Sequence, residues 1–98
     1  MSVIRMGEMQ AAEGKTEELR AFLLTIVPII TGSDGAISCQ LLHNQDDPTK
    51  FAMIEVWESV DAHRASVKNI PPEMLAAIRP LLGAAPSGGY YAEVTDRS

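Results

Sequence analysis

The sequence has a single cysteine, Cys39, among its 98 residues. An intrachain disulfide is therefore impossible, and nothing in the composition indicates an oxidising compartment. Long apolar runs are lacking too, because the longest, residues 22–30, is interrupted by Thr25 and Pro28. A membrane-spanning helix needs about 20 apolar residues. The first residues contain no apolar run of signal-peptide length, so we expect a cytoplasmic protein with no membrane partner.

Positive charge is scarce. The eight Lys and Arg residues are scattered, and 13 Asp and Glu residues give a net charge of -5. Nucleic-acid binding depends on clustered cations, so we expect no nucleic-acid partner. The chain also lacks internal repeats, linkers and low-complexity segments.

The composition that remains, 46% hydrophobic and 21% charged, is that of a globular protein. The length suits one domain over residues 1–98. A domain of this size buries only about 60–65% of the surface that its unfolded chain exposes. A partner subunit would therefore add useful burial.

Hydrophobic periodicity and turn residues predict alternating strands and helices. Strands are predicted at 3–9, 36–43, 51–58 and 90–94, and helices at 16–30, 59–69 and 72–82. Thr16 and Ser59 are expected as N-caps and Gly83 as the end of the last helix. Residues 84–89 are expected to form a loop. The order predicts an α+β fold of the ferredoxin-like βαββαβ type, an antiparallel sheet with helices on one face.

The two middle strands are predicted to form a hairpin in which paired residue numbers sum to about 94. Side chains alternate along a strand. One face would hold Ile37, Cys39, Leu41, His43, Phe51, Met53, Glu55 and Trp57, and the other Ser38, Gln40, Leu42, Ala52, Ile54 and Val56. Helices can cover only one face, so we expect the other to pack on a second copy in a homodimer. The alternative is a monomer with a partly apolar, hydrated sheet face.

Several segments carry a family resemblance. Gly-Ala-Ile-Ser-Cys-Gln-Leu at 35–41 follows a helix, and Asp-Asp-Pro-Thr-Lys-Phe follows at 46–51. Ile-Glu-Val-Trp-Glu-Ser comes next at 54–59, then Ala62 and Pro80-Leu81-Leu82. In order and spacing the chain resembles, from about residue 3 to residue 94, the antibiotic biosynthesis monooxygenase (ABM) family of the dimeric α/β-barrel superfamily.

The resemblance implies a homodimer of ferredoxin-like subunits, each with a pocket between helices and sheet. Characterised members oxidise aromatic polyketides or quinols with O2 and need neither metal nor flavin. The phenolate or enolate of the substrate supplies the electrons, and the protein positions the aromatic and holds its anion. Some relatives bind and degrade haem.

The chain departs from the family pattern at two positions. Members often carry tyrosine at the position of Cys39 and histidine at that of Ser66, the residue that a haem-degrading relative uses as iron ligand. Cys39 and Ser66 are predicted to contact the ligand in their place. The alternative for Cys39 is a buried small residue of the core. His63 lies one helical turn before Ser66 and could share its face.

Four further predictions concern single residues. Trp57 is either a pocket wall for an aromatic ligand, as the resemblance implies, or a core residue. Glu55 on the same face is either a base or a structural hydrogen-bonding group, because a buried carboxylate needs partners. His63 is either a general base or a hydrated helix residue. Met53 is expected to line the pocket or fill the core.

We predict no metal site and no cofactor. Cys39 and His43 are four strand residues apart, about 13 Å, which is too far to ligate one ion. The leading hypothesis is a cofactor-independent monooxygenase for a small aromatic or quinol, with Glu55 and His63 as catalytic groups. The alternative is a non-catalytic dimeric ligand-binding or stress-response protein. An isomerase or decarboxylase in the same pocket is a third hypothesis, because fold does not fix chemistry.

Overall fold

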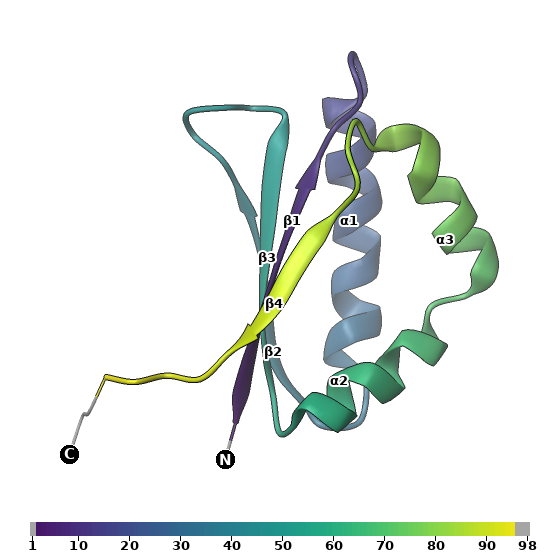
Figure 1. Cartoon of the computed structure of the whole chain (residues 1–98). Helices are drawn as coiled ribbons and strands as arrows, with labels where there is room; N and C mark the ends of the chain where they lie inside the picture. Colours follow the sequence, from purple (N-terminus) through teal and green to yellow (C-terminus); the bar gives the residue numbers. More distant parts are fainter. Residues whose placement is uncertain (1, 96–98) are drawn as a thin grey trace.

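The computed structural model describes residues 2–95. Its strands are β1 (Val3–Gln10), β2 (Ala36–His43), β3 (Lys50–Trp57) and β4 (Ser87–Tyr91), and its helices are α1 (Thr16–Thr31), α2 (Val60–Ser66) and α3 (Pro72–Ile78). Short 3₁₀ turns, Val67–Asn69 and Arg79–Leu81, follow α2 and α3 (Figure 1).

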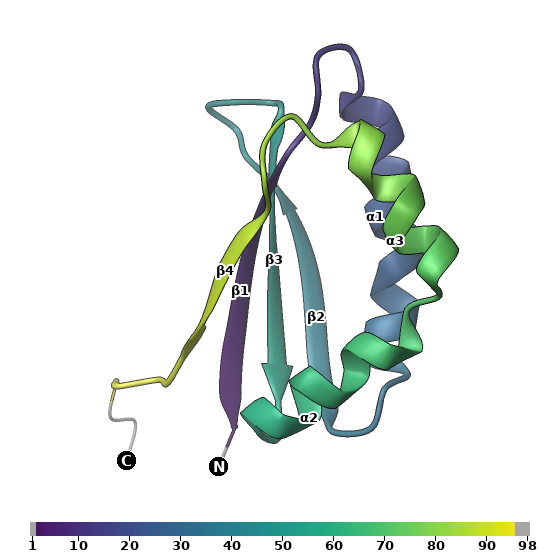
Figure 2. The same ribbon diagram turned by 45° about the vertical axis from the view of Figure 1, so that its right-hand side comes forward.

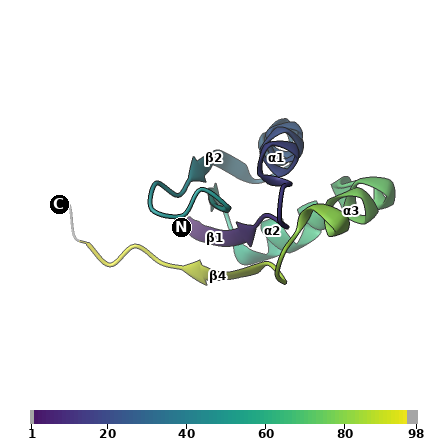
Figure 3. The same cartoon turned by 90° about the horizontal axis from the view of Figure 1, so that it is seen from above.

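The strands form one antiparallel sheet in the order β2-β3-β1-β4. All three helices cover the same face of this sheet, and no helix covers the other face in the described part of the chain (Figures 2 and 3). The predicted ferredoxin-like α+β fold is confirmed. None of the helices within residues 2–95 has the length and hydropathy needed to cross a bilayer.

The helix α1 follows the predicted amphipathic pattern, with Leu19, Leu23, Ile26 and Ile30 buried. Its start was predicted one residue too late. The Lys15 carbonyl already accepts the Leu19 amide at 2.9 Å, so Lys15 occupies the cap position and Thr16 is the first helical residue.

Ser59 caps α2 as predicted, because its hydroxyl accepts the Ala62 amide at 3.0 Å. The last helix ends earlier than expected. Pro80 has no N–H for a helical bond, and α3 gives way to a 3₁₀ turn that finishes before Leu82. Gly83 therefore does not cap it, and instead donates its amide to the Gln10 carbonyl at 2.8 Å.

The hairpin register is confirmed from residue 38 to residue 43, where Leu41 faces Met53. The pairing shifts between Ala36 and Ser38, so that Ala36 faces Trp57. The predicted position of Ile37 on the covered face is therefore wrong. Ala36 packs on the core in its place, while Ile37 is 58% exposed.

The last strand lies three residues earlier than predicted. Ile4, close to the start of β1, pairs with Tyr91. Residues 92–95 therefore find no further partner on β1 and leave the sheet (Figure 1). The segment 87–89, predicted as loop, forms the first half of β4.

The core lies between α1 and the sheet. Beyond the four α1 side chains it contains Phe51, Met53 and Trp57 from β3, and Ala11. Burying a large apolar side chain contributes about 1.5–3 kcal/mol. The outer sheet face stays partly open, with Met6 and Leu42 exposed.

Candidate functional site

A cavity of about 180 Å³ opens on the helix-covered side of the sheet, toward its β1–β4 edge. It lies over the centre of β1 and β3, and its lining is Arg5, Gly7, Glu8, Met9, Met53, Glu55, His63, Pro86 and Ser87. An apolar cavity of about 150 Å³ can hold one benzene molecule. The size therefore suits a single aromatic ring.

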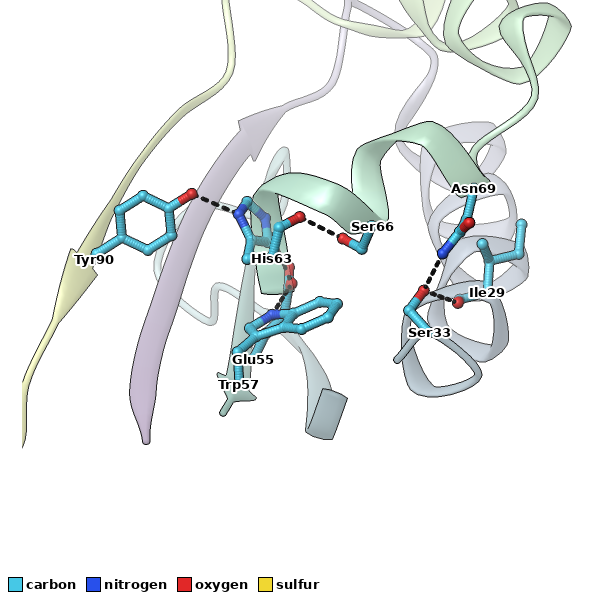
Figure 4. A network of polar contacts seen from close by, with 8 residues as sticks. All are labelled: Ile29, Ser33, Glu55, Trp57, His63, Ser66, Asn69 and Tyr90. Carbon is cyan, nitrogen blue, oxygen red and sulfur yellow. Dashed lines mark hydrogen bonds and ion pairs between the residues drawn. The ribbon is translucent and has the colours of Figure 1, made fainter. Parts of the chain in front are cut away.

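Glu55 is the buried carboxylate of this cavity, with a residue exposure of 7%. The indole N–H of Trp57, two residues along β3, donates to its Oε1 at 2.8 Å (Figure 4). Burial raises the pKa of Glu55 above its ordinary 4.5, while the Trp57 bond and the charge of Arg5 oppose the rise. The carboxyl is thus fixed in place and more basic than a hydrated one.

His63 comes from α2 and lies between Glu55 and Tyr90 of β4 (Figure 4). Its Nδ1 shares a hydrogen bond of 2.6 Å with the Tyr90 hydroxyl, and its Nε2 lies 3.9 Å from Glu55 Oε1. Burial, with help from the charges of Arg5 and Arg64, lowers the pKa of His63 below 6.5. The ring is therefore neutral at neutral pH, and its contact with Glu55 is not an ion pair there.

The tautomer of His63 decides what Nε2 can do. With the proton on Nδ1, the ring donates to the Tyr90 oxygen and Nε2 keeps a lone pair. With the proton on Nε2, Tyr90 donates to Nδ1. In the first form Nε2 can accept a proton, and Glu55 is placed to stabilise the imidazolium that results.

Arg5 brings the positive charge of the site. In the strand register, Arg5 of β1 lies opposite Glu55 of β3 on one side and opposite Tyr90 of β4 on the other. All three side chains therefore share one face of the sheet. Its guanidinium carbon lies 5.0 Å from the centre of the Tyr90 ring, and that of Arg64 lies 5.7 Å from it.

The structure places three of the candidate site residues, Glu55, His63 and Met53, around the cavity. Trp57 is fully buried and does not line it, so the indole is a core residue that holds Glu55. Its T-shaped contact with the His63 ring, 5.4 Å between centres, links it to the site.

Cys39 and Ser66, expected to contact a ligand, are also absent from the lining. The Cys39 side chain packs against the core, where burial and then the nearby Glu55 raise the pKa of the thiol to about 11. The Ser66 hydroxyl donates to the His63 carbonyl at 2.6 Å, within its own helix. Neither side chain therefore belongs to the lining of the cavity.

Arg5 and Tyr90 were missed as site residues. Strand alternation together with the β1–β3 register would have placed Arg5 beside Glu55, but this register cannot be deduced from local sequence. Tyr90 needed the β4 register as well. Within residues 2–95, no three His, Cys, Asp or Glu side chains are grouped to hold a metal ion.

The comparisons with known proteins point to one family. A model of the family described as antibiotic biosynthesis monooxygenase matches residues 2–80. Rv0793 from Mycobacterium tuberculosis has a TM-score of 0.83 at 19% identity, with 100% of each chain covered. SnoaB, described as a cofactor-independent oxygenase from Streptomyces nogalater, has a TM-score of 0.80 at 19% identity, covering 97% of this chain and 95% of SnoaB.

A protein of Chloroflexus aurantiacus, described as a candidate antibiotic biosynthesis monooxygenase, is 26% identical with a TM-score of 0.74, covering 100% of this chain and 98% of that one. No curated protein matches the sequence. Because the family model covers most of the chain, the protein belongs to the antibiotic biosynthesis monooxygenase family.

Proposed function

We propose that the protein is a cofactor-independent monooxygenase that oxidises a small aromatic or quinol with O2 in the cavity between sheet and helices. One observation carries the proposal: in a chain of this family, a neutral imidazole, a buried carboxylate and a guanidinium line the same cavity. The description of SnoaB as a cofactor-independent oxygenase agrees with this type of chemistry.

In the proposed reaction His63 removes a proton from an acidic phenol or enolisable carbon of the substrate. Its lowered pKa keeps Nε2 unprotonated and ready to accept, and Glu55 then faces the imidazolium at 3.9 Å. Arg5 supplies positive charge to the cavity in which the substrate anion forms. Tyr90 and Trp57 act indirectly. The hydrogen bond with Tyr90 fixes the His63 ring, and that from Trp57 fixes the Glu55 carboxyl.

The anion then reduces O2. A carbon–oxygen bond forms to give a peroxide, which takes up the proton from His63. Loss of water then leaves a carbonyl at that carbon: the hydrogen that His63 removed and the hydrogen still on the carbon leave as water with one oxygen atom of O2. One oxygen atom enters the product and the other leaves as water, which balances the reaction without a further reductant.

The test is oxygen uptake with a panel of single-ring hydroquinones and phenols, matched to the size of the cavity. The chain has two histidines, and the exposed His43 at the hairpin end provides a matched control. Loss of general-base catalysis typically costs about 10²–10⁴-fold in rate, which we expect for His63→Gln and not for His43→Gln. Trp57→Phe should also be slower, because Glu55 loses its hydrogen bond. The proposal is wrong if no compound supports uptake, or if His63→Gln and wild type react equally fast.

A second candidate, a non-catalytic ligand-binding protein, is favoured by the satisfaction of the polar groups. Glu55 and His63 already bond within the protein, and no buried side-chain polar atom in the described part lacks a partner. This candidate predicts that single-ring aromatics quench Trp57 fluorescence without oxygen uptake.

We propose further that the protein is a homodimer through the outer sheet face. That face carries the half-buried Ile54 and Val56 beside the exposed Met6 and Leu42. Light scattering should give twice the mass of one chain, and Ile54→Glu should give a single chain. Leu24→Glu on the exposed side of α1 is the control. A wild-type monomer at micromolar concentration would contradict the dimer.

A further inference from the structure

Among the described residues, no carboxylate lies within ion-pair distance of the Arg5 guanidinium. No ion pair in the described residues involves Arg5, although Glu55 is its direct neighbour across the β1–β3 ladder. Glu55 Oε1 instead accepts a hydrogen bond from the Trp57 N–H and lies 3.9 Å from His63 Nε2. A half-buried guanidinium therefore lines the cavity without forming an ion pair in the described residues.

The Arg5 side chain is held in this position from two sides. Its guanidinium lies over the Tyr90 ring, which His63 in turn fixes by the 2.6 Å hydrogen bond. Gly88 leaves room for it, since a Cβ there would come within 2.7 Å of Arg5 Nη2. Ser87, which precedes Gly88, also lines the cavity. A guanidinium fixed in this way loses little conformational entropy when it binds.

The other charged groups around the cavity leave it suited to an anion. Glu8 lines the rim but alternates to the outer face of the sheet with respect to Arg5. Glu55 is the opposing charge. Its buried carboxyl already accepts the Trp57 N–H and lies 3.9 Å from His63 Nε2. The Arg64 guanidinium lies near the same Tyr90 ring and adds a second positive charge.

Resting on the proposed role of this cavity as the substrate site, we propose that Arg5 determines specificity: the ligand is a small, single-ring aromatic with an anionic group, most simply a carboxylate, which pairs with the Arg5 guanidinium. The cavity of about 180 Å³ accommodates a single ring, and Met9 and Met53 provide apolar walls for it. A guanidinium and a carboxylate form two parallel charge-assisted hydrogen bonds, so charge and orientation are selected together.

The experiment compares two probes that differ in this group alone, 4-hydroxybenzoate and 4-hydroxybenzyl alcohol. Binding is measured without oxygen, by calorimetry and by Trp57 fluorescence, so that it does not depend on turnover. We expect the acid to bind at least about tenfold more tightly than the alcohol. Arg5→Gln should remove this preference and Arg5→Lys should keep part of it. Arg20→Gln, on the exposed surface of α1, should leave it unchanged.

The proposal is overturned if wild type binds both probes equally, binds neither, or prefers the alcohol. It is equally overturned if a folded Arg5→Gln variant, checked by circular dichroism, keeps the full preference. Because wild-type selectivity is decisive by itself, a variant that fails to fold does not obscure the result. Selective binding without oxygen uptake would support this inference and contradict the monooxygenase proposal, so the two are tested separately.

Discussion

Replacing Trp57 by phenylalanine removes the hydrogen bond that fixes Glu55. The indole N–H donates to the Glu55 carboxylate at 2.8 Å, and both residues are buried. A hydrogen bond to a charged group contributes about 1.5–3 kcal/mol, and the buried ring atoms that are lost contribute about 1–2 kcal/mol more. The free energy of unfolding should therefore fall by about 2.5–5 kcal/mol.

Urea unfolding of a double-mutant cycle separates the bond from the packing. The cycle comprises wild type, Trp57→Phe, Glu55→Leu and the double variant. At about pH 8 the coupling between the two sites should be about 1.5–3 kcal/mol. In acid below the ordinary pKa of 4.5, where Glu55 is protonated, it should fall to about 0.5–1.5 kcal/mol. A coupling below about 0.5 kcal/mol at the higher pH would refute the reasoning.

Three further predictions concern pH, backbone space and thiol reactivity. The pKa of His63 in the folded state lies below 6.5, so the unfolded chain binds the proton at a higher pH than the folded chain, and the free energy of unfolding should fall as the pH falls below 6.5. His63→Gln should reduce this fall in urea unfolding at a series of pH values. An unchanged dependence of the free energy of unfolding on pH would contradict the assignment. Gly88→Ala should lower the melting temperature, because its Cβ would lie 2.8 Å from a backbone carbonyl oxygen, whereas Gly7→Ala, whose Cβ has only a 3.8 Å contact, should not. With its pKa raised to about 11, Cys39 should react with a thiol reagent at about pH 8 at least tenfold more slowly than a free cysteine peptide, and equal rates would be inconsistent with its burial.

The sequence contained enough to predict the sheet, because alternation in two neighbouring strands fixes which side chains share a face. Met53, Glu55 and Trp57 lie on the helix-covered face, as expected from their spacing. The bulge that turns Ile37 outward could not be predicted, because an extra residue leaves the local alternation unchanged and alters only the pairing with β3.

Only part of the polar site could be predicted, because strand pairing cannot be deduced from local sequence. Glu55 and His63 are unusual residues for a buried face and could be noticed individually. Arg5 and Tyr90 become partners only through the registers of β1 with β3 and β4. The glycines at the start of β4 resembled a loop, whereas Gly88 provides the space that Arg5 occupies.

The most direct test of the account is to run the reaction under isotopically labelled O2 with a single-ring hydroquinone that supports uptake, and to measure the mass of the product by mass spectrometry. If the protein is a monooxygenase that works in this cavity, each product molecule should contain one labelled oxygen atom and the other should appear in water. Neither labelled product nor labelled water should form when His63 is replaced by glutamine. Oxygen consumption that yields hydrogen peroxide and an unlabelled product, or no consumption at all, would contradict it.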